Sequence, residues 1–376
     1  MRRRGTDSAG LARAVGGTPA EDTGDAIGHP LSGTARGRWL TRGKDGRLTL
    51  HAPSDDGLLR WTERRPGGPE WTGPDFFPAE HLTDLVIAQG ADGIVHLLAR
   101  RPRADDPGVE IVHAIQYQSG RPVTEWRSLG NPYRTAENGR KAGLPTAAVD
   151  TQGTVFVFLR NAGRGLQLRR EQKDGKWGRW EDLRGSRLGD GPVPAATSDG
   201  HVEVAVPSEQ GVRLWAQDAP DGALSAVEPP LECGALAGSG TALETAPGRL
   251  TYYWTDPESA SVVAHRRGGP VVPIGGSPGD GALAALRARV DGQDCTVLAQ
   301  RGADGTLLLG VCATEAERHG MWWSDTGVAC TGDPALALDA LDRVVVAIRG
   351  ADGAPRLTRQ DPDGPGLTLS PDWRRL

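Results

Sequence analysis

The chain has 376 residues with 53 Gly, 28 Pro and 38% hydrophobic residues, and because Gly and Pro interrupt regular elements, this composition favours short strands between turns over a helical protein. The formal net charge is −5, and basic residues are mixed with acidic ones throughout, so we expect no nucleic acid partner. No stretch approaches the roughly 18 apolar residues of a membrane-spanning helix, which argues against membrane insertion.

Residues 1–33 are predicted to be a disordered tail. Met1–Gly5 contains three consecutive arginines, but no apolar segment of the kind that an export signal requires follows it. The tail also lacks the hydrophobic period of a strand or a helix, so it buries too little apolar surface to order itself. A cytoplasmic location is therefore the default expectation.

From residue 34 to residue 376 the chain repeats one unit. The clearest copy is Leu144–Leu183, in which four strand-like segments are separated by polar turns. The turn before the second segment recurs at intervals of 47, 60, 47, 48, 44 and 50 residues, at Gly46, Gly93, Gly153, Gly200, Gly248, Gly292 and Asp342. The long second interval contains Arg101–Gly108, which is predicted to be an inserted hairpin loop. Seven units follow from this count.

The four segments of a unit differ in composition. First segments such as Thr146–Val149 consist of small residues, second segments such as Val155–Leu159 are continuous apolar runs, and third segments alternate between apolar and polar residues. Four strands in a unit of about forty residues are typical of a propeller blade, and small residues suit the crowded strands around its channel. We therefore predict one all-β domain over residues 34–376, a seven-bladed β-propeller of four-stranded blades.

The third unit carries a recognisable segment. Trp177–Gly185 (WGRWEDLRG) resembles the W-x-x-W-x-x-L-G-G segment of PLL-like bacterial lectins, and the likeness extends upstream to Pro145 and recurs weakly at Glu125–Gly130. Members of that family are seven-bladed propellers that bind fucose and related glycans in shallow pockets between blades. The resemblance thus implies a lectin-like, carbohydrate-binding bacterial protein whose Trp rings pack against a sugar.

The same resemblance selects candidate ligand residues. Trp177 and Trp180 are the first candidates for the sugar platform and Trp126 is the next, with Arg179 and Glu181 as hypothetical partners of sugar hydroxyls. A Trp on an outer strand can instead be a packing residue that closes the blade, and exposed charged residues can be solvated surface. Both interpretations stay open at each position.

Other units keep or lose this tryptophan. The fourth and fifth units have Ser225–Leu231 and Pro270–Gly276 at the corresponding place, so we expect their sugar sites to be lost. Tryptophans are retained in the first, sixth and seventh units at Trp71, Trp322, Trp323 and Trp373. Four more fall within strand patterns and are predicted to be structural: Trp39, Trp61, Trp215 and Trp254.

Common catalytic, metal and cofactor motifs are missing. The eight histidines show no HExxH or short Cys/His spacing, no GxSxG is present, and Gly275–Gly281 lacks the GK[ST] of a phosphate loop. Ser324–Gly327 has the wrong spacing for the Asp box of sialidases. We therefore expect no catalytic residues, no metal and no cofactor, hence not an enzyme. Two alternatives remain, a protein-interaction platform and an enzyme with carboxylates from separate blades at the channel mouth.

Cysteine positions in the sixth unit predict a strand register. If Arg301 lies opposite Thr306, antiparallel pairing places Cys295 opposite Cys312. Because no export signal is present, we expect these thiols to be reduced and Cys233 and Cys330 to be packing residues.

Overall fold

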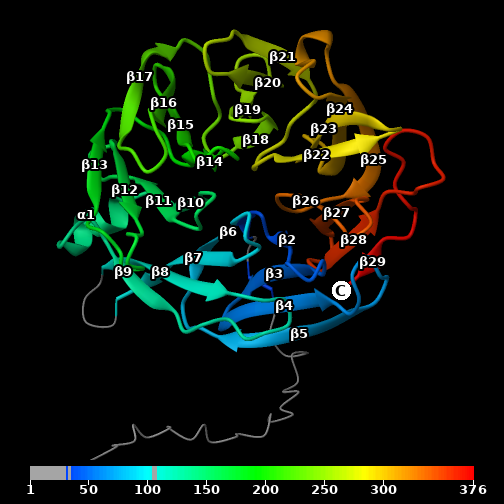
Figure 1. The fold of residues 1–376 in the computed structure, drawn as a ribbon, viewed down its shortest axis with the longest axis horizontal. Helices are drawn as coiled ribbons and strands as arrows, with labels where there is room; N and C mark the ends of the chain where they lie inside the picture. The colour runs from blue at the N-terminus through cyan, green and yellow to red at the C-terminus, as the bar shows by residue number, and fades with distance from the viewer. Residues whose placement is uncertain (1–30, 33–34, 104–107) are drawn as a thin grey trace, which may run out of the picture.

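The computed structural model describes residues 31–32, 35–103 and 108–376. Seven sheets stand radially around a central axis, and each runs from an innermost first strand to an outermost fourth strand (Figure 1). Every blade has four consecutive strands paired antiparallel, and the sheet of blade 2 carries β1 (Arg36–Gly37) as a fifth, parallel strand at its inner edge. This confirms the predicted all-β, seven-bladed propeller.

The blades are numbered in chain order. Blades 1 to 3 contain β2 (Leu40–Arg42), β3 (Leu48–Ser54), β4 (Gly57–Glu63) and β5 (Trp71–Pro78); β6 (Thr83–Gln89), β7 (Val95–Pro102), β8 (Val109–Gln116) and β9 (Arg127–Gly130); and β10 (Thr146–Val149), β11 (Val155–Arg160), β12 (Leu166–Arg170) and β13 (Glu181–Arg184). Blades 4 and 5 contain β14 (Val193–Ala196), β15 (Val202–Ser208), β16 (Gly211–Gln217) and β17 (Leu224–Leu231); and β18 (Thr241–Ala246), β19 (Arg249–Asp256), β20 (Ser261–Arg266) and β21 (Val271–Gly275). Blades 6 and 7 contain β22 (Ala284–Val290), β23 (Gln293–Arg301), β24 (Thr306–Ala313) and β25 (Trp322–Ala329); and β26 (Ala335–Leu338), β27 (Val344–Arg349), β28 (Pro355–Arg359) and β29 (Arg374–Arg375). Within the described residues, two short helices, α1 (Ala136–Lys141) and η2 (Glu317–His319), lie in connections.

The hydrophobic core is divided among the interfaces between blades. β11 is buried along nearly its whole length because both of its faces are covered by neighbouring blades. Phe156 and Phe158 pack toward blade 4, whereas Val155 and Val157 pack toward blade 2. The continuous apolar pattern of the second strands therefore reflects burial on both faces.

The start of the described chain adds to this framework. β1 (Arg36–Gly37) pairs parallel with the innermost strand β6 of blade 2. Leu31 forms a bridge with Ser54, so the described end of the predicted tail contacts blade 1. Residues 1–30 of that tail and residues 104–107 of the predicted inserted loop lie outside the described residues, although β7 and β8 flank the loop as expected.

Side chains join blade 7 to blade 1. Trp39 Nε1 donates to the Asp333 carbonyl at 3.2 Å, and Arg359 Nη2 lies 2.5 Å from the buried Glu63 carboxylate. Since each blade is made of consecutive strands, these contacts and the shared apolar cluster close the ring.

Four tryptophans connect a blade to the preceding one by an indole hydrogen bond. Trp180 donates to Leu129, Trp215 to Leu183, Trp254 to Gly234 and Trp323 to Ile274, all to backbone carbonyls at 2.8–3.3 Å. In blade 4 the fourth strand has no Trp, and Trp215 of the third strand, paired with Ala226, makes this bond instead. Trp39, Trp61, Trp215 and Trp254 are buried, which confirms their predicted structural role.

The predicted register of blade 6 is wrong by one residue. Arg301 pairs with Leu307, so Cys295 lies opposite Ala313 and Cys312 lies opposite Thr296. The turn is longer than expected because Gly302 N donates to the Thr306 carbonyl at 2.7 Å, which places five residues in the turn. Strand alternation then directs Cys295 and Cys312 to opposite faces of the sheet. All four cysteines are unpaired.

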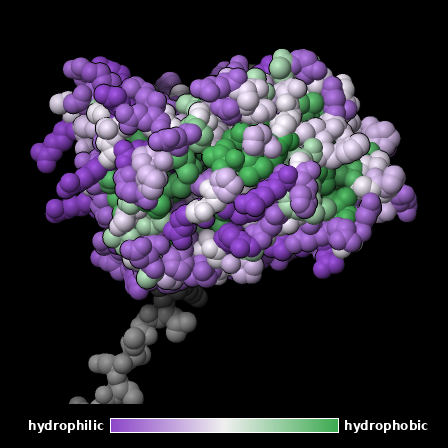
Figure 2. Space-filling model, turned by 90° about the horizontal axis from the view of Figure 1, so that it is seen from above, coloured by the Kyte–Doolittle hydropathy of each residue, from purple (hydrophilic) through white to green (hydrophobic). Residues whose placement is uncertain are grey.

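The rim of the propeller is largely hydrophilic, with apolar side chains gathered in bands between hydrophilic ones (Figure 2). Among the described residues, the exposed large hydrophobic side chains are Tyr117, Trp322 and Leu341. None of the helices in this part of the chain has the length and apolar character needed to cross a bilayer.

Candidate functional site

A groove of about 690 Å³ lies between blades 6 and 7. One wall comes from β24 and β25, and the other comes from residues 365–373 of the connection between β28 and β29. Figure 1 shows this connection in red, projecting beside β25. Gly366 N donates to both carboxylate oxygens of Asp291, at 3.1 and 3.0 Å, which ties the connection to blade 6. We call this feature the blade 6/7 groove.

Two tryptophans line the groove. Trp322 is 79% exposed on the β25 wall, and the half-buried Trp373 belongs to the opposite wall. Adjacent residues of a strand point to opposite faces, so Trp323 turns away from the groove and donates its indole N–H to blade 5. Gly310 pairs with Trp323, and a Cβ there would lie 2.9 Å from the indole ring, so this position requires glycine.

Hydroxyl groups supply the polar part of the groove. Thr326 donates its hydroxyl to the Leu307 carbonyl at 2.9 Å, and Thr368 donates to the Pro365 carbonyl at 2.6 Å. Both side chains are thereby fixed, and each oxygen keeps acceptor capacity. Ser324 and Ser370 also line the groove, whereas none of its lining residues is charged. An uncharged groove is notable in a chain of which 24% is charged.

The predicted tryptophan sites lie elsewhere. Trp177 and Trp180 are half-buried against blade 2, where Trp177 meets the His113 ring edge-on at 5.3 Å and the Arg169 guanidinium lies 5.9 Å from the Trp180 ring. Trp126 packs at the interface of blades 1 and 2. The structure therefore brings Trp177 and Trp180 to one blade interface and places Trp126 at the preceding one.

The predicted polar partners are not directed at these rings. Arg179 and Glu181 are exposed and flank Trp180 in sequence. Because side chains alternate along an extended strand, they point away from the face on which Trp180 packs. The five candidates thus do not converge on one pocket, and a sugar site at blade 3 stays a prediction.

The sequence analysis identified Trp322 and Trp373 as tryptophans retained in the sixth and seventh units. It did not predict that residues 365–373 form a wall of a groove opposite Trp322. The available signal was the long segment Asp361–Asp372, rich in Pro and Gly, in the place where other units have a short connection. Such a segment can stand out from a blade, but its position beside the preceding blade depends on the bond to Asp291.

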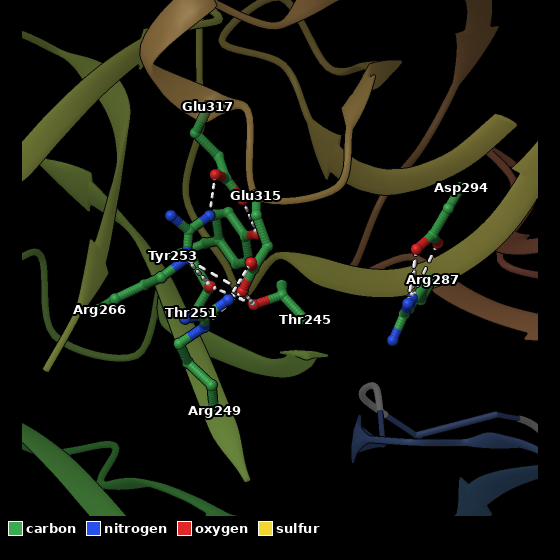
Figure 3. Close-up of polar contacts among 9 residues, drawn as sticks. All are labelled: Thr245, Arg249, Thr251, Tyr253, Arg266, Arg287, Asp294, Glu315 and Glu317. Atoms are coloured by element: carbon green, nitrogen blue, oxygen red, sulfur yellow. Dashed lines mark hydrogen bonds and ion pairs between the residues drawn. The ribbon is translucent and has the colours of Figure 1, made fainter. Parts of the chain in front are cut away.

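A charged cluster lies beside the inner strands of blades 5 and 6 (Figure 3). Arg249 Nε donates to Glu315 Oε1 at 2.6 Å, Thr245 donates to the same oxygen at 3.1 Å, and Arg287 Nε lies 2.8 Å from Asp294 Oδ1. Burial alone would raise the pKa of Glu315, but the hydrogen bonds from Arg249 and Thr245 and the nearby arginine charges lower it. The hydrogen bond from Arg287 likewise lowers the pKa of Asp294. These carboxylates are therefore ionised partners of arginines.

Tyr253 and Glu317 form the buried part of this cluster. Tyr253 Oη donates to Glu317 Oε1 at 2.9 Å, and Arg266 forms an ion pair with the other carboxylate oxygen (Figure 3). Burial, reinforced by the Glu317 charge, raises the pKa of Tyr253 above its usual range. The pair anchors η2 of blade 6 on blade 5. Elsewhere too, the described residues contain no group of three or more His, Cys, Asp or Glu side chains that could hold a metal.

Comparison with known proteins supports the fold. No protein family and no curated protein matches the sequence. Among solved structures, the PL25 ulvan lyase bound to an oligosaccharide matches with a TM-score of 0.58 and 10% identity, over 91% of this chain and 96% of that one. The Hadza microbial sialidase Hz136 matches with a TM-score of 0.50 and 14% identity, over 80% of this chain and 70% of that one. The SapL1 lectin in complex with alpha methyl fucoside has a TM-score of 0.47 and 14% identity, over 92% and 96%.

These matches correct the expectation that the chain is not an enzyme. The solved structures that this fold resembles include a polysaccharide lyase and a sialidase. The expectation that the chain is not an enzyme was based on the absence of catalytic sequence motifs. A propeller can, however, form a catalytic site from single residues of separate blades, and such a site leaves no motif in the sequence. No family match supports membership of the PLL-like lectins in particular.

Proposed function

We propose that the protein recognises a carbohydrate in the blade 6/7 groove. The observation that carries the proposal is Trp322, whose indole is 79% exposed on one wall while Trp373 lines the other. Isolated exposed apolar residues are common, but a Trp at the edge of a concave groove matches the usual composition of a ligand site. An indole face packs against the C–H groups of a sugar ring.

The polar lining fits the same ligand. Thr326 and Thr368 offer acceptor lone pairs, and Ser324 and Ser370 add hydroxyls that can donate or accept. With no charged lining residue, the groove favours an uncharged sugar over an acidic one. Recognition of this kind serves a lectin and a carbohydrate-active enzyme alike.

The test starts with a glycan array on the purified chain, followed by titration calorimetry with the best uncharged glycan. Trp322→Ala should weaken binding by about tenfold or more and leave the unfolding midpoint unchanged, because the ring is mostly exposed. Leu341→Ala is the matched control, since Leu341 is a 64% exposed apolar residue outside the groove. Wild-type affinity in Trp322→Ala would overturn the assignment.

Blade 3 provides a second carbohydrate position, supported by the W-x-x-W segment of Trp177 and Trp180. The double variant Arg179→Ala, Glu181→Ala removes the exposed candidate partners without disturbing the packed rings. If this position binds the glycan, the variant should lower affinity while Trp322→Ala leaves residual binding. Unchanged affinity would remove Arg179 and Glu181 as ligand residues of a blade 3 site.

A further inference from the structure

A second cavity, of about 270 Å³, lies on blade 5 beside η2. Four arginines line it: Arg249, Arg266, Arg267 and Arg318. The Gly268–Gly269 turn, His265 and Glu317 also contribute to its lining. The lining of this cavity is therefore rich in charged groups, whereas the lining of the blade 6/7 groove is uncharged.

Fixed carboxylates hold three of the arginines in position. Arg249 binds Glu315 through Nε and Nη2, and Arg266 binds Thr251 through Nε at 2.9 Å and Glu317 through Nη2 (Figure 3). Arg267 Nη1 lies 3.0 Å from Glu203. Each guanidinium has five N–H donors, so these contacts orient the group and leave further donors for a ligand. Held side chains lose little entropy when a ligand binds.

Positive charge exceeds negative charge around the cavity. Three of the four guanidinium groups, those of Arg249, Arg266 and Arg267, pair with the carboxylates of Glu315, Glu317 and Glu203. Arg318 is exposed and forms no ion pair with any described residue. Burial lowers the pKa of His265, an effect that the Pro270 carbonyl opposes, so the imidazole is neutral at pH 7 and the excess is one positive charge.

We propose that this cavity binds an oxyanion, such as the carboxylate of an acidic sugar or a phosphate group. The fork of a guanidinium matches the two oxygens of a carboxylate or phosphate, and the fixed arginines present it without rearrangement. Arg318 supplies a positive charge that no carboxylate of the described residues neutralises. The cavity lies on the blade 5 side of the β24–β25 connection, so the proposal stands independently of the blade 6/7 groove.

The test measures binding of glucuronate and of inorganic phosphate by titration calorimetry at constant ionic strength, with methyl glucoside as the uncharged comparison. The variants are Arg318→Ala and Arg65→Ala. Arg65 is an exposed arginine of blade 1, so its removal changes the net charge equally without touching the cavity. Both arginines are exposed, so both variants should keep the unfolding midpoint of the wild type.

We expect the wild type and Arg65→Ala to bind at least one of the two anions. Arg318→Ala should bind that anion about tenfold more weakly, because it loses a charge-assisted hydrogen bond. Tighter binding of glucuronate than of phosphate would identify an acidic sugar as the source of the oxyanion, and the reverse order would identify a phosphate group. Equal affinities in the two variants, or no binding of either anion by the wild type, would overturn the proposal. Neither result depends on whether Trp322 binds a sugar.

Discussion

Four of the described histidines are buried, and three of them, His51, His96 and His113, should make the propeller sensitive to mild acid. Burial lowers the pKa of His51 to about 4, of His96 to about 4 and of His113 to about 3. His51 Nε2 is paired with Gln116 at 2.7 Å, and His96 Nδ1 is paired with His113 Nε2 at 3.1 Å. All three rings are therefore neutral in the folded protein at pH 7.

Whether acid raises or lowers the free energy of unfolding follows from comparing protonation of these histidines in the folded and unfolded chains. In the unfolded chain each imidazole takes up a proton below its ordinary pKa of about 6.5, whereas the folded protein resists protonation until about pH 4. The free energy of unfolding is then fully retained above pH 6.5 and falls as the pH falls toward 4. For a pKa lowered to about 4, the loss at pH 5 is about 2 kcal/mol per histidine, or about 6 kcal/mol for three. That is a large part of the 5–15 kcal/mol typical of a domain.

Equilibrium urea unfolding at pH 7.5, 6.5, 5.5 and 5.0, followed by Trp fluorescence, measures this loss. The double variant His96→Leu, His113→Leu removes two of these three groups, so the loss at pH 5 should be smaller than that of the wild type by about 4 kcal/mol. His319→Gln is the control, because it removes an exposed histidine and leaves these three buried rings in place. Stability independent of pH between 7.5 and 5.0 in the wild type, or an unaltered loss in the double variant, would refute the argument.

Three further predictions concern the contacts that join the blades. Trp323→Ala should lower the free energy of unfolding by about 3 kcal/mol, because the Trp323 ring and its indole N–H join blade 6 to blade 5. Trp322→Ala on the same strand should change the free energy of unfolding by less than about 0.5 kcal/mol, because Trp322 is exposed. Equal effects of the two variants in urea unfolding would contradict the opposite orientations of the two rings. Arg359→Ala should lower the free energy of unfolding by about 3–5 kcal/mol, since it removes an ion-pair partner of the fully buried Glu63. A decrease below about 1 kcal/mol would show that ring closure does not depend on this ion pair. Deletion of residues 1–38 should lower the melting temperature by several degrees because it removes β1 from blade 2, and an unchanged calorimetric melting curve would assign β1 no structural role.

The repeat was predictable from the sequence because every blade must solve the same packing problem. Second strands such as β11 are covered on both faces and so read as apolar runs, and a turn precedes each of them. Register was not predictable, since the length of a turn depends on a single hydrogen bond such as Gly302 N to Thr306 O, and one residue more moved Cys295 and Cys312 to opposite faces. The wall formed by residues 365–373 was missed for a similar reason, because only the bond to Asp291 places it beside β25.

The same dependence on register explains why one tryptophan can be structural and its neighbour a ligand candidate. In β25, Trp323 occupies the position opposite Gly310 and reaches back to blade 5, and the position before it faces forward toward blade 7. In blade 3, Trp180 reaches back to blade 2 in the same way, and the forward-facing position before it holds Arg179, a charged residue in place of an aromatic one. Trp180 and Trp323 therefore both join their blade to the preceding one, and a ring is exposed in blade 6 because a second aromatic residue, Trp322, takes the adjacent forward-facing position. By this reasoning Arg179→Trp should expose an indole at the edge of blade 3, and unchanged glycan retention by that variant would show that an exposed ring without a facing wall such as residues 365–373 does not make a site.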